Sequence, residues 1–293
     1  MDIAAGRTDL VPPIVEAVRS RVDRVLASEL QARRDELAAL DPSAAVLVEE
    51  LERLLAAGGK RLRPAFCYLG YRAAGGAEGE PIVRAAAALE LLHTFALVHD
   101  DVMDEATERR GVETTQVRFS RAFAGASGAR GRSAAVLVGD LAAVLAEALF
   151  RTSGFPPGLV EEAFARFDRM RLEMAAGQYL DLLGSSRLDL ASAEHVAELK
   201  TGSYTVEGPL LIGAALAGAP AALESRLLAY GRPVGEAFQL RDDVLDHEAP
   251  VGAAERVDVL IEEAISALEG ARLEPVAAAG LRHAAEAMRL GER

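Results

Sequence analysis

The stretch LLHTFALVHDDVMDEATERRG, residues 91–111, begins as an apolar run and contains three aspartates with the spacing Asp-Asp-x-x-Asp. The spacing returns in FQLRDDVLDHE, residues 238–248. Within a helix, residues three or four positions apart lie on one face, so the carboxylates of each cluster can reach a common patch. The clusters are Asp100, Asp101 and Asp104, and then Asp242, Asp243 and Asp246. Crowded carboxylates repel one another, so both clusters favour a bound cation.

The chemistry of the two clusters favours Mg²⁺ over zinc. Carboxylates are hard oxygen ligands, and Mg²⁺ keeps several waters and bridges readily to phosphate oxygens. A single acidic triplet is as often a solvated helix end as a metal site. Two matching triplets, each flanked by apolar residues and arginines, therefore predict a Mg²⁺ site.

Helical periodicity extends through the rest of the 293 residues. Hydrophobic residues make up 51% of the chain and aromatic residues only 5%, which favours helix over sheet. We find no convincing β-alternation. We expect helices at about 12–33, 42–57, 64–74, 80–105, 115–124, 132–152, 158–183, 192–218, 221–246 and 253–289. The sequence therefore predicts an all-α fold, a single-domain helical bundle over residues 1–293.

The charge balance disfavours one class of partner. Lys and Arg number 32 against 45 Asp and Glu, which leaves a formal net charge of −13. An acidic surface disfavours nucleic-acid binding, so we expect no nucleic-acid partner. An anionic substrate must then be attracted by local positive charge or by bound metal.

The sequence also bears on where the protein works. The longest uncharged run, residues 208–223, is too short and too interrupted by glycine and proline to span a membrane. Residues 1–13 lack the apolar core of a signal peptide. The single cysteine, Cys67, permits no internal disulfide and is expected to be a buried, unreactive thiol. We therefore expect a cytoplasmic protein without a membrane span.

Basic residues follow or precede the first aspartate cluster at positions that suit phosphate binding. Arg109 and Arg110 come directly after it, and the glycine-rich segment GGKRLRP, residues 58–64, contains Lys60 and Arg63 at a predicted helix boundary. Guanidinium and ammonium groups beside backbone N–H donors are typical of phosphate sites. These four residues are therefore candidate phosphate ligands. We interpret isolated basic residues such as Arg61 and Arg33 as surface residues that favour solubility.

Five ordered motifs carry a resemblance to a known family. They are GGKRLRP (58–64), LLHTFALVHDDVMDEATERRG (91–111), GQYLDLL (177–183), LKTGSYT (199–205) and EAFQLRDDVLD (236–246). In this order they resemble the isoprenyl diphosphate synthases, also called polyprenyl synthetases or trans-prenyltransferases. The resemblance implies an isoprenoid synthase-like all-α fold around a deep central cavity, with the aspartate clusters at its mouth. It also implies three Mg²⁺ ions and a homodimer.

The resemblance implies roles for individual residues. All six aspartates would bind Mg²⁺ that bridges the diphosphate of an allylic substrate. The residues implied in catalysis are Asp100, Asp101, Asp104, Arg109, Lys200 and Asp242. Isopentenyl diphosphate would contact Lys60, Arg63, His93 and Arg110, the allylic diphosphate would contact Arg109, and the cavity would be lined by Lys200, Thr201, Gln178, Asp181 and Gln239.

The position of His93 gives its role some independent support. His93 lies seven residues before Asp100, so in a helix the two are about 20° apart on one face. A histidine in such a position is by itself more often a packed core residue.

The implied activity is Mg²⁺-dependent head-to-tail condensation of isopentenyl diphosphate with an allylic diphosphate: dimethylallyl, geranyl or farnesyl diphosphate. The chain resembles the short-chain type, such as geranylgeranyl or farnesyl diphosphate synthase. In relatives, the side chains four and five positions before the first aspartate form the floor of the tail cavity, and here they are Ala96 and Phe95. We expect a product of about twenty carbons, with about fifteen as the alternative.

The segment after the second cluster departs from the family pattern. Relatives continue through a loop that contributes a further lysine, whereas residues 247–270 lead almost directly into amphipathic helices. The domain is therefore expected to be shortened after residue 247. Two alternatives stay open: a catalytically weakened homologue that acts as a partner subunit or diphosphate-binding protein, and a class I terpene cyclase. The three aspartates of the second cluster disfavour the cyclase.

Overall fold

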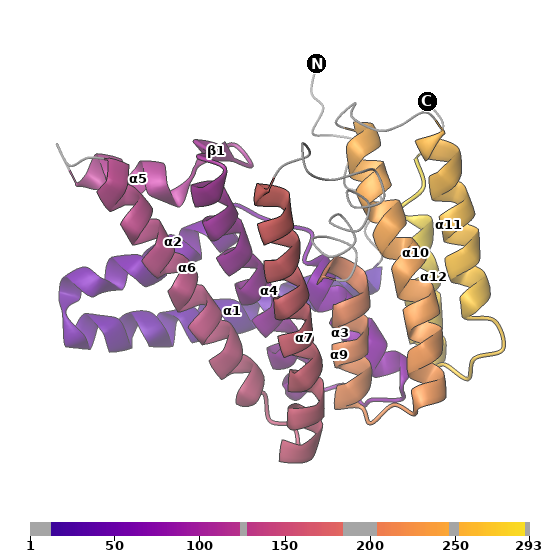
Figure 1. Cartoon of the computed structure of the whole chain (residues 1–293). Helices are drawn as coiled ribbons and strands as arrows, with labels where there is room; N and C mark the ends of the chain where they lie inside the picture. The colour runs from indigo at the N-terminus through magenta and orange to yellow at the C-terminus, as the bar shows by residue number, and fades with distance from the viewer. Residues whose placement is uncertain (1–12, 124–127, 184–203, 246–251, 291–293) are drawn as a thin grey trace. The chain divides into compact units, whose positions relative to one another are not determined.

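The computed structural model describes residues 13–123, 128–183, 204–245 and 252–290. It is almost entirely helical, which confirms the predicted all-α fold (Figure 1). The chain divides into two compact units. The first-cluster unit consists of Arg19–Arg61 and Val83–Ser153, and the second-cluster unit consists of Met1–Val18, Leu62–Ile82 and Gly154–Arg293. The prediction of one domain over residues 1–293 stays a prediction, as does the shortening after residue 247, since residues 246–251 lie outside the described part.

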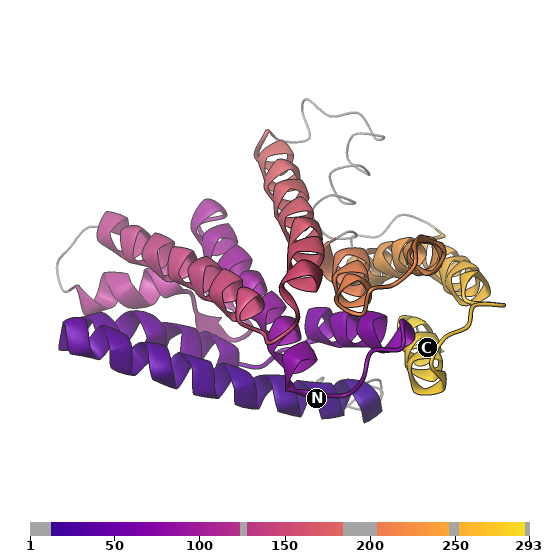
Figure 2. The same ribbon diagram turned by 90° about the horizontal axis from the view of Figure 1, so that it is seen from below.

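The first-cluster unit is built on two antiparallel helices and a central apolar helix. Its elements are α1 (Pro13–Leu40), whose first residues belong to the other unit, η1 (Pro42–Ala45), α2 (Val46–Ala56), α4 (Glu80–Met103), α5 (Thr115–Ala122) and α6 (Gly128–Arg151). The turn η1 reverses the chain so that α2 runs back beside α1, where Arg34 and Glu52 form an ion pair of 2.9 Å (Figures 1 and 2). Asp41 caps this turn by accepting a hydrogen bond of 2.8 Å from the backbone N–H of Ser43.

Helix α4 lies in the core of its unit and carries the first aspartate cluster at its C-terminal end. Ala85, Ala88, Leu89 and Leu91 are all completely buried. Small alanines allow neighbouring elements to approach closely, and leucines fill the remaining space. The apolar part of the motif therefore anchors the helix, and the aspartates follow where the helix ends.

A short β-hairpin follows α4, and the sequence did not predict it. Strands β1 (Glu108–Arg109) and β2 (Val112–Glu113) pair in antiparallel fashion, with Arg109 opposite Val112. Arg110 and Gly111 form the two-residue loop and have φ angles of 54° and 77°. A two-residue type I′ turn requires positive φ at both loop positions, and its backbone twist matches the twist of the two flanking strands. Strands of two residues are too short to show alternation, so the sequence pattern gave no sign of this hairpin.

The second-cluster unit contains the remaining helices. They are α3 (Leu62–Ala73), α7 (Pro157–Leu182), α9 (Gly208–Leu216), α10 (Ala221–Leu245), α11 (Ala253–Ala267) and α12 (Pro275–Glu286). Helices α3 and α9 meet through glycines: a Cβ atom on Gly70 would lie 2.1 Å from the carbonyl oxygen of Leu210. Tyr230 of α10 is completely buried and donates a hydrogen bond of 2.7 Å to the carbonyl of Leu281 in α12.

The expected single helix over 253–289 is in fact two helices, so that prediction was wrong. Helix α11 ends at Ala267, and Gly270 follows with a φ of 70°. Pro275 then begins α12, and Glu274 accepts a hydrogen bond of 2.9 Å from the N–H of Ala277. A left-handed glycine followed by an N-capped proline ends one helix and starts the next. The first part of the helix expected over 192–218 lies outside the described residues.

Two of the described helices are long and apolar enough to cross a membrane by length and composition. They are Glu80–Met103 and Gly128–Arg151, and 67% and 50% of their apolar windows are buried inside the protein. Helices of a protein core have the same composition, so this observation is weak evidence for a membrane span.

Candidate active site

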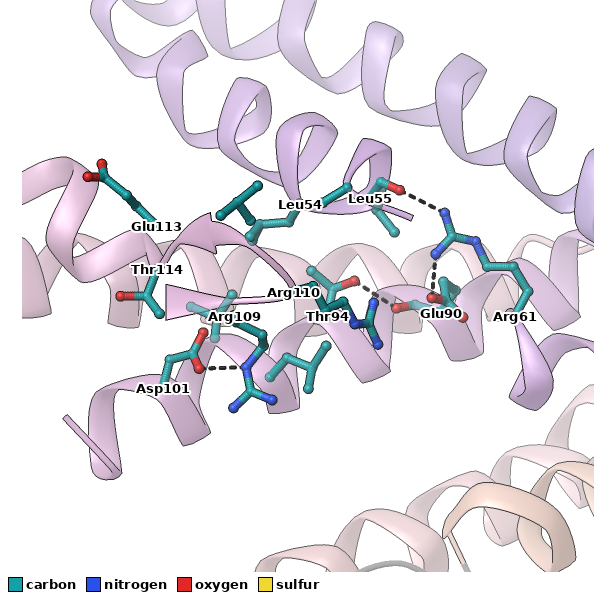
Figure 3. Close-up of a pocket in the computed structure, with 14 residues that line it drawn as sticks. Leu54, Leu55, Arg61, Glu90, Thr94, Asp101, Arg109, Arg110, Glu113 and Thr114 are labelled. Atoms are coloured by element: carbon teal, nitrogen blue, oxygen red, sulfur yellow. Dashed lines mark hydrogen bonds and ion pairs between the residues drawn. The ribbon is translucent and has the colours of Figure 1, made fainter. Parts of the chain in front are cut away.

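The last turns of α4 place the three aspartates of the first cluster in different environments. Asp101 is only 3% exposed, Asp100 is half-buried and Asp104 is exposed. The buried carboxylate of Asp101 accepts a hydrogen bond of 2.6 Å from Nε of Arg109 in β1 (Figure 3). The hairpin thus turns back toward the end of α4 and brings a predicted phosphate ligand to a predicted metal ligand.

The ionisation of Asp101 reflects these surroundings. Burial raises the pKa of its carboxyl, the hydrogen bond and charge of Arg109 lower that pKa, and the nearby carboxylate of Asp104 raises it. The net direction is upward, because one arginine does not offset burial and the second carboxylate together. A cation beside Asp101 and Asp104 would relieve both, so this end of α4 fits Mg²⁺.

Residues at the start of α5 hold the end of α4 in place. The side-chain amide of Gln116 donates hydrogen bonds of 2.8 Å to the carbonyls of both Asp101 and Ala106. The hydroxyl of Thr114 donates to Ala106 at 2.8 Å. These bonds connect the last turn of α4, and the residues just after it, to the start of α5. Sequence reasoning missed Gln116 and Thr114, and the only available signal was a polar run directly after the hairpin.

The hairpin loop also reaches the glycine-rich segment. Arg110 donates a hydrogen bond of 2.8 Å from Nη1 to the carbonyl of Gly58. Lys60, two residues later, is exposed. Within the first-cluster unit, the structure therefore brings together three elements that the sequence linked to phosphate: the end of α4, the hairpin and the Gly58–Lys60 turn.

Arg61 is not the surface residue that we expected. Its side chain is 5% exposed and donates a hydrogen bond to Glu90 at 2.7 Å (Figure 3). It donates another to Asp23 at 2.9 Å. It also donates to the carbonyl of Leu55 at 2.9 Å. Within GGKRLRP, Lys60 is exposed, Arg61 is buried and Arg63 is partly buried, and a run of basic letters does not reveal this difference. Arg33, by contrast, has a partly exposed side chain and pairs with neighbours on its own helix, as expected of a surface residue.

Helix α4 places the other predicted residues of this unit one to two turns before the aspartates. His93, Phe95 and Ala96 are all partly buried. The ring of Phe95 packs edge-on against the ring of His99, with centroids 4.8 Å apart. The backbone carbonyl of Val136 in α6 lies 3.1 Å from Nε2 of His99. The chain-length prediction for Phe95 and Ala96 stays a prediction, as does the role of His93.

A small enclosed space lies between these elements (Figure 3). Its volume is about 30 Å³, room for one or two water molecules and far too little for a prenyl diphosphate. The polar side chains that line it are Arg61, Glu90, Thr94, Asp101, Arg109, Arg110, Glu113 and Thr114. The space therefore shows how these groups are packed, and it is not itself a substrate pocket.

The second-cluster unit holds the other predicted residues that the structure describes. At the end of α10, Asp242 and Asp243 are partly buried, and Gln239 donates a hydrogen bond of 2.7 Å to Asp243. Near the end of α7, Gln178 is buried and Asp181 is exposed. The predicted residues Lys200, Thr201 and Asp246 lie outside the described part of the chain.

Arg63 in the same unit is held by the described end of the LKTGSYT motif. Its Nη2 donates to the hydroxyl of Thr205 at 2.9 Å, and its guanidinium lies 4.3 Å from the centre of the Tyr204 ring. Tyr204 belongs to a single π-helical turn before α9, a feature often found at functional sites. Arg63 is therefore fixed in orientation by a second predicted motif.

Among the described residues, no group of three carboxylate, histidine or cysteine side chains is gathered into a metal cage. Mg²⁺ seldom uses such a cage, because it keeps several waters and binds through one or two carboxylates together with phosphate oxygens. Carboxylate oxygens that repel one another fit this ion, and the described parts of both aspartate clusters contain such oxygens.

Comparison with known proteins identifies the family. The model of a family described as polyprenyl synthetase matches residues 44–256. The chain belongs to the polyprenyl synthetase family. The match covers all five sequence motifs, so the resemblance noted from the sequence is confirmed.

Several members of the polyprenyl synthetase family are clearly similar to this chain. Geranylfarnesyl diphosphate synthase of Aeropyrum pernix is 36% identical over 198 residues, which cover 66% of this chain and 58% of that protein. The short chain isoprenyl diphosphate synthase of Methanothermobacter thermautotrophicus is 33% identical over 221 residues, 75% of this chain and 64% of that protein. The matched part of this chain thus spans less than two thirds of these curated relatives.

A solved structure of a polyprenyl synthetase extends the similarity over the whole fold. It is the geranylgeranyl pyrophosphate synthase of Corynebacterium glutamicum, complexed with isoprenyl diphosphate and magnesium. The TM-score is 0.84 at 26% identity, and the match covers 96% of this chain and 99% of that chain. The fold expected from the motifs is therefore the fold of the family.

Proposed function

We propose that this polyprenyl synthetase condenses isopentenyl diphosphate with an allylic diphosphate, head to tail and in the presence of Mg²⁺, to make a short-chain prenyl diphosphate. The observation that carries the proposal is the pairing of Asp101 with Arg109 at the end of α4. It places a phosphate-binding cation against an acidic cluster that needs a metal. The names of the similar proteins, which are prenyl diphosphate synthases, support the same reaction.

Arg109 is suited to bind the diphosphate that leaves the allylic substrate. Its Nε donates to Asp101, and this bond fixes the plane of the guanidinium. The Arg109 side chain is 35% exposed, so a ligand can reach it. A guanidinium has further N–H donors on its two Nη atoms, in a fork that matches phosphate oxygens. As the C–O bond breaks, negative charge grows on the diphosphate, and a donor already in position stabilises that charge. Lys200, which lies outside the described residues, is proposed to help stabilise the charge on the leaving diphosphate.

Mg²⁺ is proposed to be held by Asp100, Asp101 and Asp104 and by Asp242, Asp243 and Asp246, with three ions in all. When bound, it supplies charge neutralisation to the diphosphate oxygens. The protein's own contribution is to supply the carboxylates from helix ends, where the helix fixes their spacing. Asp243 is oriented by its bond from Gln239, and Asp101 by its bond from Arg109.

Isopentenyl diphosphate is proposed to bind Lys60, Arg63, His93 and Arg110, with its double bond toward the allylic carbon. Arg63 and Arg110 are each held by a hydrogen bond, to the hydroxyl of Thr205 and the carbonyl of Gly58 respectively. Fixed donors limit the motion of the second substrate and favour attack over quenching by water. Gln178, Thr201 and Gln239 are proposed to line the same cavity. Phe95 and Ala96 are proposed to limit the product to about twenty carbons, with about fifteen as the alternative.

The proposal includes a homodimer that works in the cytoplasm and binds no nucleic acid. Helix α6 supports the dimer, because Val136, Leu137 and Val144 are 40%, 57% and 64% exposed. Apolar side chains grouped on one helix are typical of protein interfaces. Size-exclusion chromatography with light scattering will give the mass, and a monomer at micromolar concentration would contradict this part of the proposal.

One assay tests the reaction. The protein is incubated with Mg²⁺, isopentenyl diphosphate and, in turn, dimethylallyl, geranyl and farnesyl diphosphate, and the products are separated by chromatography. Prenyl diphosphates longer than the primer support the proposal. Hydrocarbon release from the primer alone would instead indicate a terpene cyclase, and binding without turnover would indicate a diphosphate-binding homologue.

A further inference from the structure

We infer that Arg61 is a positioning residue that holds the Gly58–Lys60 turn and the hairpin loop in the geometry needed to bind the diphosphate of isopentenyl diphosphate. This inference rests on the proposed function. Neither Arg61 nor its partner Glu90 was among the residues expected to take part. The contacts of Arg61, the crowding at Gly59 and the shared face of α4 carry the inference.

Arg61 ties three helices of the first-cluster unit to one point. It donates to Asp23 of α1, to the carbonyl of Leu55 in α2 and to Glu90 of α4. Both Arg61 and Glu90 are about 5% exposed at their side chains. A buried arginine that meets three acceptors in different directions has very little freedom of orientation. The backbone at Arg61 is therefore fixed as well, with a left-handed φ of 51°.

The crowding around Gly59 shows that Arg61 and Arg110 shape the same turn. A Cβ atom on Gly59 would lie 2.9 Å from Nη1 of Arg61 and 3.3 Å from Nη1 of Arg110. It would lie 3.7 Å from the carboxylate of Glu90. Two guanidinium groups thus converge on one glycine, and the carboxylate of Glu90, which pairs with Arg61, lies beside the same glycine. Arg110 completes the arrangement with its bond to the carbonyl of Gly58.

The consequence for Lys60 follows from its place in the chain. Lys60 lies between Gly59, over which the two arginines pack, and Arg61, which is fixed by three acceptors. The direction in which exposed Lys60 leaves the backbone is therefore determined by Arg61. Arg110, the other proposed ligand on this side, is held against the same turn. Loosening Arg61 should displace both ligands together.

Helix α4 links this arrangement to the aspartate cluster. Glu90 and Asp101 are eleven residues apart, so they lie about 20° apart on one face of the helix, and both line the same small space. Thr94 lies between them and donates to the carbonyl of Glu90 at 2.9 Å. The face of α4 thus carries two arginine–carboxylate pairs, Arg61–Glu90 and Arg109–Asp101. The first pair positions the isopentenyl side and the second the allylic side.

The test uses steady-state kinetics on three variants of the whole chain. Arg61→Lys keeps the charge but cannot reach three acceptors, and Glu90→Gln removes the balancing charge. Asp23→Asn weakens only the acceptor that is 41% exposed, so it is expected to fold normally. Arg33→Lys is the matched control, because it makes the same substitution at a partly exposed arginine that is paired only with neighbours on its own helix.

We expect Arg61→Lys and Glu90→Gln to raise KM for isopentenyl diphosphate by about tenfold or more, since misplaced ligands weaken binding. The KM for the allylic diphosphate and kcat should each change less than about threefold. Asp23→Asn should show the same pattern with a smaller rise, and Arg33→Lys should match the unchanged protein. The two stronger variants combined should raise KM less than the product of the single effects, because they disrupt one pair.

A merely structural role would lower the melting temperature and change both KM values alike, and that result would overturn the inference. An unchanged KM for isopentenyl diphosphate in all three variants would overturn it too. If Arg61→Lys does not fold, Glu90→Gln and Asp23→Asn decide between the same outcomes. If the unchanged protein makes no prenyl diphosphate that is longer than the primer, the proposed function fails and the inference fails with it. If the unchanged protein turns over and the variants have the same KM for isopentenyl diphosphate, the inference fails while the proposed function stands.

Discussion

At the scale of single residues, the structure separates side chains that the sequence treats as equivalent. Asp101 and Asp104 belong to one motif, yet Asp101 is buried against Arg109 and Asp104 is exposed. Arg61 and Lys60 are adjacent basic residues, yet Arg61 is buried and Lys60 is exposed. The motif predicted the location of the site. Whether each side chain points into the core or toward solvent depends on backbone φ values and on partners far along the chain, which one sequence does not reveal.

The first prediction concerns the two aspartates. Asp104→Ala should leave stability level or raise it in metal-free buffer, because it removes a carboxylate that repels Asp101. Asp101→Ala should lower stability by about 1–2 kcal/mol, because Arg109 loses its partner while remaining only partly exposed. Both variants should lose turnover. Thermal unfolding followed by circular dichroism measures the stabilities, and equal destabilisation by the two substitutions would contradict the prediction.

The second prediction concerns Cys67, which is completely buried in α3. Burial raises the pKa of its thiol, so the folded protein should not react with a chromogenic disulfide reagent at pH 8, and the denatured protein should react at once. The raised pKa also sets the sign of a pH effect. The thiol's contribution to stability is present below the unfolded pKa of about 8.5 and is lost as the pH rises toward the folded value. Rapid labelling of the native protein would show that the site opens.

At the scale of helices and turns, regular elements were predicted well and their interruptions were not. The sequence predicted a helix over 80–105, and α4 runs over Glu80–Met103. Long apolar periodicity makes such an element easy to recognise. The hairpin at Glu108–Glu113 and the break between α11 and α12 were missed, because each depends on a few residues with local turn chemistry. The hairpin matters most, since it carries Arg109 and Arg110.

Glu50 illustrates a contact between elements that the sequence could not show. It is 1% exposed on α2 and accepts hydrogen bonds from Arg53 at 2.6 Å, from Arg118 at 2.9 Å and from the hydroxyl of Thr115 at 2.9 Å. The last two lie on α5, which follows the hairpin. Glu50 therefore fastens α5 to α2 and so supports the position of the arginine hairpin.

The third prediction follows from these bonds. Glu50→Gln should lower the free energy of unfolding by about 1–3 kcal/mol, because a carboxamide cannot balance two arginines or accept all their hydrogen bonds. Glu49→Gln is the matched control, because Glu49 is the adjacent glutamate on α2 and its side chain is exposed. Chemical denaturation measures both variants. If they unfold at the same denaturant concentration, Glu50 does not fasten the two helices.

The fourth prediction concerns the contact of α4 with α6. A Cβ atom on Gly139 would lie 2.2 Å from two ring atoms of His99, and His99 packs against Phe95. Gly139→Ala should therefore displace His99 and loosen the Phe95 ring, which changes the distribution of product lengths. Phe95→Ala should lengthen the product directly. Gly158→Ala, where a Cβ meets nothing within 4 Å, is the control. Chromatography that shows the same products for all variants would place the limit on product length elsewhere.

At the scale of the whole molecule, each unit has its own core of buried protein side chains. The second-cluster unit has a core of completely buried residues that includes Leu210, Leu227, Tyr230 and Leu281. The first-cluster unit is held by buried apolar residues of α4 and by the ion pairs of Arg61 and Glu50. In the part of the chain that the structure describes, these contacts involve protein groups alone. The acidic net charge of −13 further means that cations are attracted to the protein before any substrate is bound.

The last prediction separates folding from activity on this basis. Chelation of Mg²⁺ should abolish turnover while helical content stays the same and the melting temperature falls by no more than about 2 °C, because no described core contact is lost. Adding Mg²⁺ together with inorganic diphosphate should then stabilise the protein by about 2.7 kcal/mol at one hundred times the dissociation constant. Asp104→Ala should lose this ligand-dependent gain and keep the metal-free melting temperature. Unfolding on chelation alone would show that the aspartate clusters serve the fold rather than the reaction.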